Sequence, residues 1–289
     1  MIKHLIISGG DLSVFAMLGA IDILTDKYDD YDVNNIENIY SVSAGSMIGL
    51  LICLKINIKT IVNYFIERPW NKLINISTQD LFNIFDTRGI LDVHFLYETY
   101  KPLLKMCNLD ENVTFKQLFD YSKIRLNIYA TKYSNLELHC FNHINNPDTK
   151  VIDAIFMSST IPFIFTPLKH DGEYFIDGGY NSNYPIQFCL NDNENIDEVL
   201  GINSINHDDP TVVTDDENVL SFYGKLFYKL ILDRRKINDT NNEKYKKLLL
   251  VTDYFSIELF LNLINHSEKR EEFINIGRSN ANTYLSYMN

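Results

Sequence analysis

The sequence has few cysteines and no long apolar run. Its four cysteines, Cys53, Cys107, Cys140 and Cys189, are widely spaced without a Cys-x-x-Cys pair, so neither a zinc knot nor a dense disulfide framework is indicated. No apolar run approaches the roughly 20 residues of a membrane span. The first residues also lack the apolar segment and cleavage site of a secretory signal. We therefore expect a cytoplasmic protein, with peripheral membrane attachment as the alternative.

Positive charge is also scarce. The 26 Lys and Arg residues stand against 38 Asp and Glu, which gives a formal net charge of -12. This balance argues against a nucleic-acid partner and against adsorption to anionic bilayers by charge alone, although transient membrane-surface contact stays open. The 289 residues are 46% hydrophobic, which is ample for a sizeable core. Since no repeat or low-complexity linker interrupts the chain, we predict one domain over residues 1–289.

A strand, a turn and a helix follow one another twice near the N-terminus. Residues 4–8 are apolar and end at two glycines, and helical spacing begins at Val14. Residues 37–43 form a second apolar stretch, which continues into a helical pattern at 44–54. This order predicts an α/β protein with helices packed on a parallel sheet.

Further elements are expected along the rest of the chain. Asn112 is a candidate cap for a helix at 112–122, and a helix within 148–167 should be interrupted at Pro162. Alternation and apolar runs predict strands over 125–133, 136–142, 173–177, 198–204 and 247–253.

Residues 219–231 have apolar side chains at helical spacing, with Lys225 and Lys229 near the border of the apolar face. Two interpretations remain open for this aromatic helix. It either packs on the sheet or lies against a bilayer surface.

Ser43 is a candidate nucleophile. A serine presented on a sharp strand-to-helix turn needs small residues two positions to either side, and Ser41 and Gly45 meet that requirement. Serine and glycine also occur together at ordinary helix starts, so a helix cap is the alternative interpretation.

Such a serine needs a general base, and no histidine of the sequence is an obvious candidate for it. The candidate histidines are His139, His143, His170 and His207. No motif surrounds any of them, so we expect surface residues or ordinary packed residues. Asp177 is a better candidate, because it ends an apolar strand and precedes Gly178 and Gly179. Its carboxylate could take the serine proton directly. The alternative is a turn or cap residue.

A glycine turn at Gly9 and Gly10 separates the first strand from the first helix. Amide groups at such a turn, together with the positive end of the helix dipole, stabilise a developing oxyanion. A nucleotide phosphate is the competing ligand, but the stretch matches neither GxGxxG nor GxxxxGK[ST].

Taken in order, these three segments resemble the patatin-like phospholipase family, whose members carry a glycine-rich oxyanion loop, a GxSxG elbow and a late DG[GA] motif. Segments 113–133, 151–186 and 270–285 are also similar to the connecting segments of the family. The resemblance covers most of residues 3–286.

The resemblance implies a three-layer α/β/α fold with a mainly parallel central sheet. It also implies a serine-aspartate dyad without histidine, in which Ser43 attacks an ester carbonyl and Asp177 is the base. Phospholipids or lysophospholipids are the implied substrates, and neither a metal nor an organic cofactor is implied. The residues expected to support the elbow and the aspartate are Ser41, Gly45, Gly178 and Gly179. Those expected to hold the oxyanion through backbone N–H groups are Gly9, Gly10, Asp11 and Ala44.

The chain departs from the family pattern GGGxRG in its glycine loop, where Asp11, Ser13 and Val14 differ. Asp11 brings a side chain beside the expected oxyanion, and Ser13 removes a fixed positive charge. Ser41 also replaces the first glycine of the elbow. These changes leave a second possibility open, namely a catalytically weak or inactive patatin-like domain that binds lipid or a protein partner.

Overall fold

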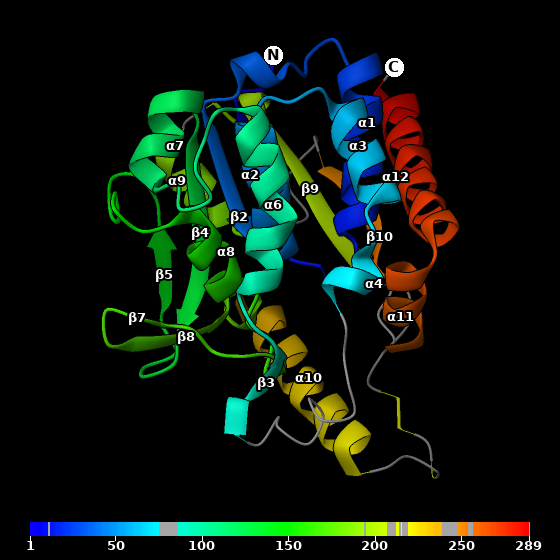
Figure 1. Cartoon of the computed structure of the whole chain (residues 1–289). Helices are drawn as coiled ribbons and strands as arrows, with labels where there is room; N and C mark the ends of the chain where they lie inside the picture. The colour runs from blue at the N-terminus through cyan, green and yellow to red at the C-terminus, as the bar shows by residue number, and fades with distance from the viewer. Residues whose placement is uncertain are drawn as a thin grey trace.

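The structure is a computed structural model, and it describes residues 1–10, 12–74, 86–193, 195–206, 212–213, 215, 219–238, 248–253 and 257–288. Five parallel strands form most of its central sheet, in the order β10-β9-β1-β2-β4 (Figure 1). They are β1 (His4–Ile7), β2 (Asn38–Val42), β4 (Arg125–Lys132), β9 (Val199–Asn206) and β10 (Leu248–Asp253). The sequence predicted each of these strands.

Antiparallel strands complete the sheet beside β4. Both β5 (Leu138–Phe141) and β8 (Glu173–Asp177) pair with β4, and β7 (Lys169–His170) pairs with β8. A separate parallel pair, β3 (Gly89–Leu91) and β6 (Phe163–Phe165), was not predicted. The sheet is therefore mainly parallel, as expected, with an antiparallel end at β4.

Helices cover the sheet and its carboxyl end. They are α1 (Val14–Lys27), α2 (Ala44–Cys53), α3 (Ile58–Glu67), α4 (Trp70–Leu73), α6 (His94–Met106), α7 (Phe115–Ser122), α8 (Val151–Ser158), α9 (Ile186–Asp192), α10 (Val219–Asn238), α11 (Ile257–Asn265) and α12 (Ser267–Met288). Short 3₁₀ turns are η1 (Val33–Asn35), η2 (Gly178–Tyr180) and η3 (Ile196–Glu198).

One predicted helix cap was wrong. The N-cap of α7 is Thr114, not Asn112, because the Thr114 hydroxyl accepts from the Gln117 amide while the Gln117 side chain accepts from the Thr114 amide. This reciprocal capping box satisfies two amide donors at once. The Asn112 side chain instead bonds to Asp110 in the preceding turn.

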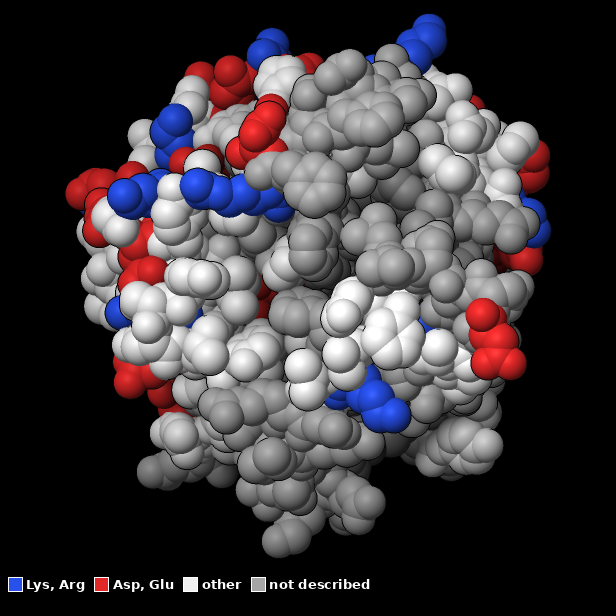
Figure 2. Space-filling view, turned by 90° about the horizontal axis from the view of Figure 1, so that it is seen from below, with Lys and Arg blue, Asp and Glu red and all other residues white. Residues whose placement is uncertain are grey.

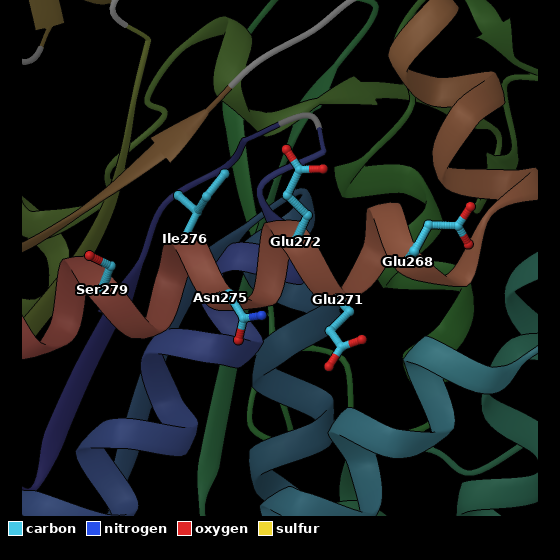
Figure 3. A pocket seen from close by; sticks show the side chains of 6 residues that line it. All are labelled: Glu268, Glu271, Glu272, Asn275, Ile276 and Ser279. Carbon is cyan, nitrogen blue, oxygen red and sulfur yellow. The ribbon is translucent and has the colours of Figure 1, made fainter.

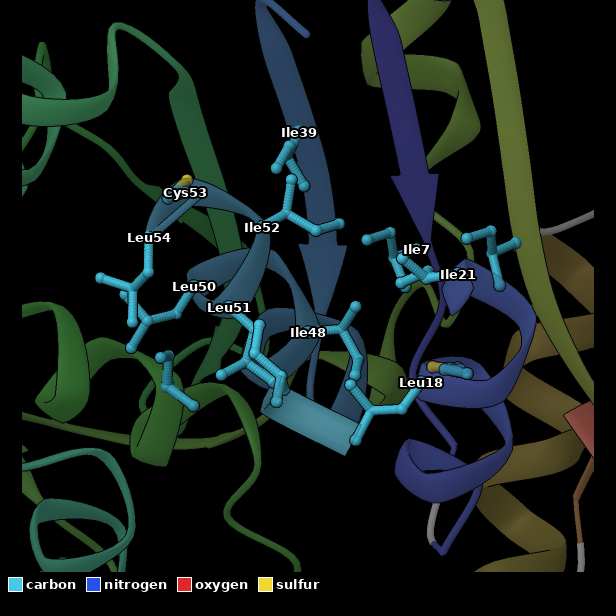
Figure 4. Close-up of a cluster of buried hydrophobic side chains, with 14 of the residues drawn as sticks. Ile7, Leu18, Ile21, Ile39, Ile48, Leu50, Leu51, Ile52, Cys53 and Leu54 are labelled. Atoms are coloured by element: carbon cyan, nitrogen blue, oxygen red, sulfur yellow. The ribbon is translucent and has the colours of Figure 1, made fainter. Parts of the chain in front are cut away.

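Alternate residues of the strands face two different cores. In β1, Leu5 and Ile7 belong to the larger cluster, whereas Ile6 belongs to the smaller one. Figure 4 shows the larger cluster, where side chains of α1 and α2 meet those of β1 and β2. The smaller cluster lies on the opposite face, where Ile186 and Cys189 of α9 cover the sheet. A sheet buried on both faces is the usual setting of parallel strands, whose residues are apolar in succession.

The long C-terminal helix α12 packs closely along α1 (Figure 1). A Cβ atom on Gly19 would lie 1.9 Å from the Ile274 carbonyl oxygen, and one on Gly277 would lie 1.7 Å from the Ala16 oxygen. Both glycines are therefore required by the close approach of the two helices. None of the helices in the described part of the chain has the length and apolar character needed to cross a bilayer.

This contact gives a stability prediction. Gly277→Ala forces α12 away from α1, so we expect the free energy of unfolding to fall by about 1–3 kcal/mol in urea denaturation. Gly224→Ala in α10 is the matched control, because nothing lies within 4 Å of its added methyl group. That variant should keep or slightly raise the stability through helix propensity. Equal effects of the two substitutions would contradict the close packing of α1 and α12.

Candidate active site

Ser43 lies at the turn between β2 and α2. Its backbone has φ 51° and ψ −124°, and a residue with a side chain adopts such a positive φ only at an energetic cost. Ser43 is the N-cap residue of α2, but its hydroxyl makes no capping hydrogen bond. An ordinary helix cap therefore does not account for this serine, whereas a sharp elbow does.

Close backbone contacts hold this turn in place. The Ser43 amide donates to the Ser158 hydroxyl (2.8 Å), which in turn donates to the Tyr129 carbonyl (2.6 Å). A Cβ atom on Gly45 would lie 2.4 Å from the Ile7 carbonyl oxygen. Only glycine therefore lets the first turn of α2 pass so close to the end of β1.

Ser41, at the other small position of the elbow, is completely buried. Its hydroxyl donates to the Asn127 carbonyl (3.1 Å) of the neighbouring strand β4. A buried hydroxyl is tolerated where it has a partner. The replacement of the family glycine by serine at this position is thus accommodated in the sheet.

Asp177 lies beside the elbow because β2 and β8 pair with the same edge of β4. Tyr129 pairs with Val42 of β2 and with a residue of β5, whereas Ala130 pairs with Asp177 of β8 and with a residue of β5. A strand has two edges, and β5 takes one of them at both positions. The ends of β2 and β8 therefore meet on the other edge, which brings Asp177 beside the residues that lead into Ser43.

The Asp177 side chain is buried, with 9% of its surface exposed, and its Oδ1 accepts from the Gly179 amide (2.6 Å). Asp177 therefore does cap the turn η2, and that bond also fixes the orientation of its carboxylate. Gly178 is required by close packing, since a Cβ atom there would lie 2.1 Å from the Tyr129 oxygen and 3.2 Å from Val42 Cγ1.

The glycine loop adjoins the elbow. A Cβ atom on Gly9 would lie 3.3 Å from Ser43 Cβ and 2.5 Å from Asn183 Oδ1. The Gly9 amide, however, donates to the Asn183 carbonyl (2.9 Å). Gly9 was predicted to supply an oxyanion donor, and the structure does not support that part of the prediction, because its N–H group already has a partner.

Gly10, in the glycine loop, and Ala44, directly after Ser43, are two other predicted amide donors. Gly10 has no amide hydrogen-bond partner among the described residues. Ala44 is the first residue of α2, where backbone amides lack partners within the helix. The positive end of the α2 dipole adds to their effect on a nearby anion. Asp11, the third predicted donor, lies outside the described residues.

The three candidate histidines that the structure describes pack against other side chains, in line with the prediction of surface or packed residues. His139 packs edge-on against Phe141, His143 stacks on a phenylalanine of α7, and His170 lies within hydrogen-bond distance of a threonine. Burial lowers the pKa of both His139 and His143. His207 lies outside the described residues.

The sequence analysis missed three polar residues around the elbow and the glycine loop: Ser158, Asn183 and Ser204. Ser158 holds the Ser43 amide. Asn183 and Ser204 both donate to the Gly9 carbonyl. Asn183 follows the Asp177 motif by six residues, which was the only signal in the sequence that could have drawn attention to it.

A shallow hollow lies elsewhere, on the outer side of α12. Figure 3 shows the side chains that line it, among them Glu268, Glu271 and Glu272. These carboxylates project from one helix and lie away from the elbow. Within the described ranges, no group of His, Cys, Asp or Glu side chains is arranged to hold a metal ion.

Helix α10 contacts η2, the turn that follows Asp177, and lies below the sheet in Figure 1. It therefore packs at the end of the sheet. Its outward side carries Phe222, Tyr223, Leu226 and Leu230, which are 43% to 61% exposed. Figure 2 views the molecule from this end and shows uncharged side chains with both Lys or Arg and Asp or Glu side chains around them.

Comparison with known proteins gives a consistent set of relatives. The family model for patatin-like phospholipase matches residues 5–190. An uncharacterized protein, R571 of Acanthamoeba polyphaga mimivirus, is 30% identical over 216 residues, which cover 74% of this chain and 70% of that protein. A probable lipid hydrolase, 463L of invertebrate iridescent virus 6, is 26% identical over 192 residues, which cover 65% of this chain and 63% of that protein.

Two solved structures share the fold. VipD from Legionella pneumophila superposes with a TM-score of 0.56 at 15% identity, over 99% of this chain and 67% of that one. The type III effector ExoU from Pseudomonas aeruginosa superposes with a TM-score of 0.51 at 11% identity, over 99% of this chain. This chain spans about half of ExoU, with 53% covered.

The strained conformation of Ser43 can be tested through stability. Glycine removes a strain of about 1–3 kcal/mol, which exceeds its additional entropy cost of about 0.5–1 kcal/mol. We therefore expect Ser43→Gly to have a free energy of unfolding about 1 kcal/mol above that of Ser43→Ala. Urea denaturation of the two variants measures this difference. A Ser43→Gly variant no more stable than Ser43→Ala would show that the turn is not strained.

Proposed function

The chain belongs to the patatin-like phospholipase family, and on that premise we propose that it hydrolyses acyl esters of phospholipids or lysophospholipids through Ser43 and Asp177. The observation that carries this proposal is the meeting of β2 and β8 on one edge of β4, where a serine on a strained elbow follows one strand and an oriented carboxylate ends the other.

The proposed reaction has two halves. Asp177 takes the proton of the Ser43 hydroxyl as the oxygen attacks the ester carbonyl, and it returns that proton to the departing alcohol. The amides of Gly10 and Ala44, with that of Asp11, stabilise the negative charge on the carbonyl oxygen. Asp177 then takes a proton from a water molecule as the water oxygen attacks the acyl group, and it returns that proton to the Ser43 oxygen as the fatty acid departs. Every step uses side chains and amides of the chain itself.

The alternative is a weak or inactive domain that binds lipid or a protein partner. It is favoured by the loop, in which Asp11 replaces a glycine and the Gly9 amide is already bonded. Loss of one oxyanion donor typically lowers the rate by about a hundredfold to a thousandfold. Slow turnover with intact lipid binding is therefore the outcome expected from this alternative.

We also propose that one domain covers residues 1–289. The family model ends at residue 190, yet β9 and β10 extend the same sheet, and α12 packs against α1. The later part of the chain therefore shares the core of the first part.

The outward side of α10 is proposed to contact the lipid surface. Phe222, Leu226 and Leu230 recur every four residues and so share one face of the helix, and the exposed Lys229 borders this face. The opposite side of α10 is the inner one, where Ile231 is buried. Aromatic and leucine side chains beside lysine are typical of helices that lie in a membrane interface. The net charge of -12 favours a zwitterionic surface over an anionic one.

The catalytic proposal predicts that Ser43→Ala abolishes fatty-acid release from phosphatidylcholine micelles. Asp177→Asn should nearly abolish it, because an amide does not accept the hydroxyl proton. Thermal unfolding confirms that each variant is folded. Release by folded Ser43→Ala at the wild-type rate would exclude the proposed mechanism.

The surface proposal predicts that Leu226→Asp weakens binding to phosphatidylcholine vesicles by about tenfold or more, since burial of a leucine side chain contributes about 1.5–3 kcal/mol. Vesicle co-sedimentation measures this binding. Tyr287→Asp on α12 is the control, because Tyr287 is an exposed hydrophobic residue on another helix. Equal losses in both variants would contradict a specific role of α10.

A further inference from the structure

The carbonyl oxygen of Gly9 accepts an unusual number of hydrogen bonds. The Ser8 hydroxyl donates at 2.8 Å, the Ser204 hydroxyl at 2.5 Å and the Asn183 side-chain amide at 3.1 Å. The Ser204 amide also donates to the Ser8 hydroxyl (2.7 Å), which links the two serines. One carbonyl group is thus fixed by donors from three separate parts of the chain.

The order of the strands tells where this carbonyl points. Ser204 belongs to β9, which lies on one side of β1, whereas Ser43 follows β2 on the other side. The described part of the chain has no cis peptide bond, and in a trans peptide the C=O and the following N–H point in opposite directions. With the Gly9 carbonyl held toward β9, the Gly10 N–H therefore points toward β2 and Ser43.

This orientation needs support because the peptide unit lies between two glycines. Glycine adopts negative and positive φ angles with similar ease. The backbone of Gly9 and Gly10 therefore does not by itself prevent this peptide unit from rotating by about 180°. A turned peptide would present a carbonyl oxygen, in place of an N–H donor, to the developing oxyanion, and the two negative groups would repel each other. The three donors oppose this rotation.

Asn183 holds the loop at two points. Its backbone carbonyl accepts the Gly9 amide (2.9 Å), and its side chain donates to the Gly9 carbonyl. The same residue lies six positions after Asp177, beyond η2. The segment that carries the proposed base therefore also orients the glycine loop.

We propose that Asn183 and Ser204 are positioning residues that hold the Gly10 amide as an oxyanion donor facing Ser43. This inference rests on the proposed function. It assigns the two side chains a role in transition-state stabilisation, through the Gly10 amide, rather than in substrate binding.

The test compares wild type with Asn183→Ala and Ser204→Ala in hydrolysis of a soluble short-chain phosphatidylcholine. Misalignment of one donor should lower kcat by about tenfold to a hundredfold. This decrease does not exceed the decrease expected when the donor is lost altogether. KM should change by no more than about twofold. Inhibition by a trifluoromethyl ketone analogue, which forms a tetrahedral adduct with the serine, should weaken in parallel with kcat. Ser204→Thr retains the hydroxyl and should restore most of the rate.

Asn193→Ala is the matched control, since its side chain bonds to the Cys189 carbonyl and the Tyr40 hydroxyl, away from the loop. Thermal unfolding of each variant identifies any loss of folding, and Ser204→Cys replaces Ser204→Ala if the latter does not fold. If wild type hydrolyses the lipid and the folded variants match it in kcat and inhibition, the positioning role is wrong while the function stands. If wild type itself releases no fatty acid, the proposed function fails, and this inference fails with it.

Discussion

The site depends on how two strands share one edge of β4. β2 occupies this edge up to Tyr129, and β8, which runs in the opposite direction, ends its pairing at Ala130. Where the two strands meet, neither can continue, so the chain must turn sharply at both ends. One turn is the elbow at Ser43, and the other is the glycine turn after Asp177. The sheet thereby brings together two residues that are far apart in the sequence.

Close backbone packing makes this meeting possible and rigid. Gly45 and Gly178 each lie where a Cβ atom would collide with a carbonyl oxygen of a neighbouring strand. The Ser43 amide is held by Ser158, which is itself bonded to Tyr129 of β4. A strained residue persists only where its surroundings fix it, and here the strands on either side do so. Such a preorganised arrangement avoids reorganisation during a reaction.

The sequence predicted the parts of this fold that are encoded locally. Apolar runs identified all five parallel strands, and the small residues around Ser43 identified the elbow. The apolar strand that ends at Asp177, before two glycines, identified the candidate base, and the family resemblance supported that choice. The roles of Asn183 and Ser204 were not predictable, because they arise from contacts with Gly9 across more than 170 positions of the chain. The same reason explains why the close packing of Gly277 on α1 was missed, whereas the error at Asn112 came from choosing the wrong polar residue in one turn.

The pairing of Ser43 with Asp177 is the central claim, and a fluorophosphonate probe tests it most directly, because the probe reacts only with an activated serine. Peptide mapping after labelling should find the adduct on Ser43 of the wild-type protein. It should find almost none on folded Asp177→Asn. Equal labelling of Ser43 in the two proteins, or no label on Ser43 in either, would contradict the account.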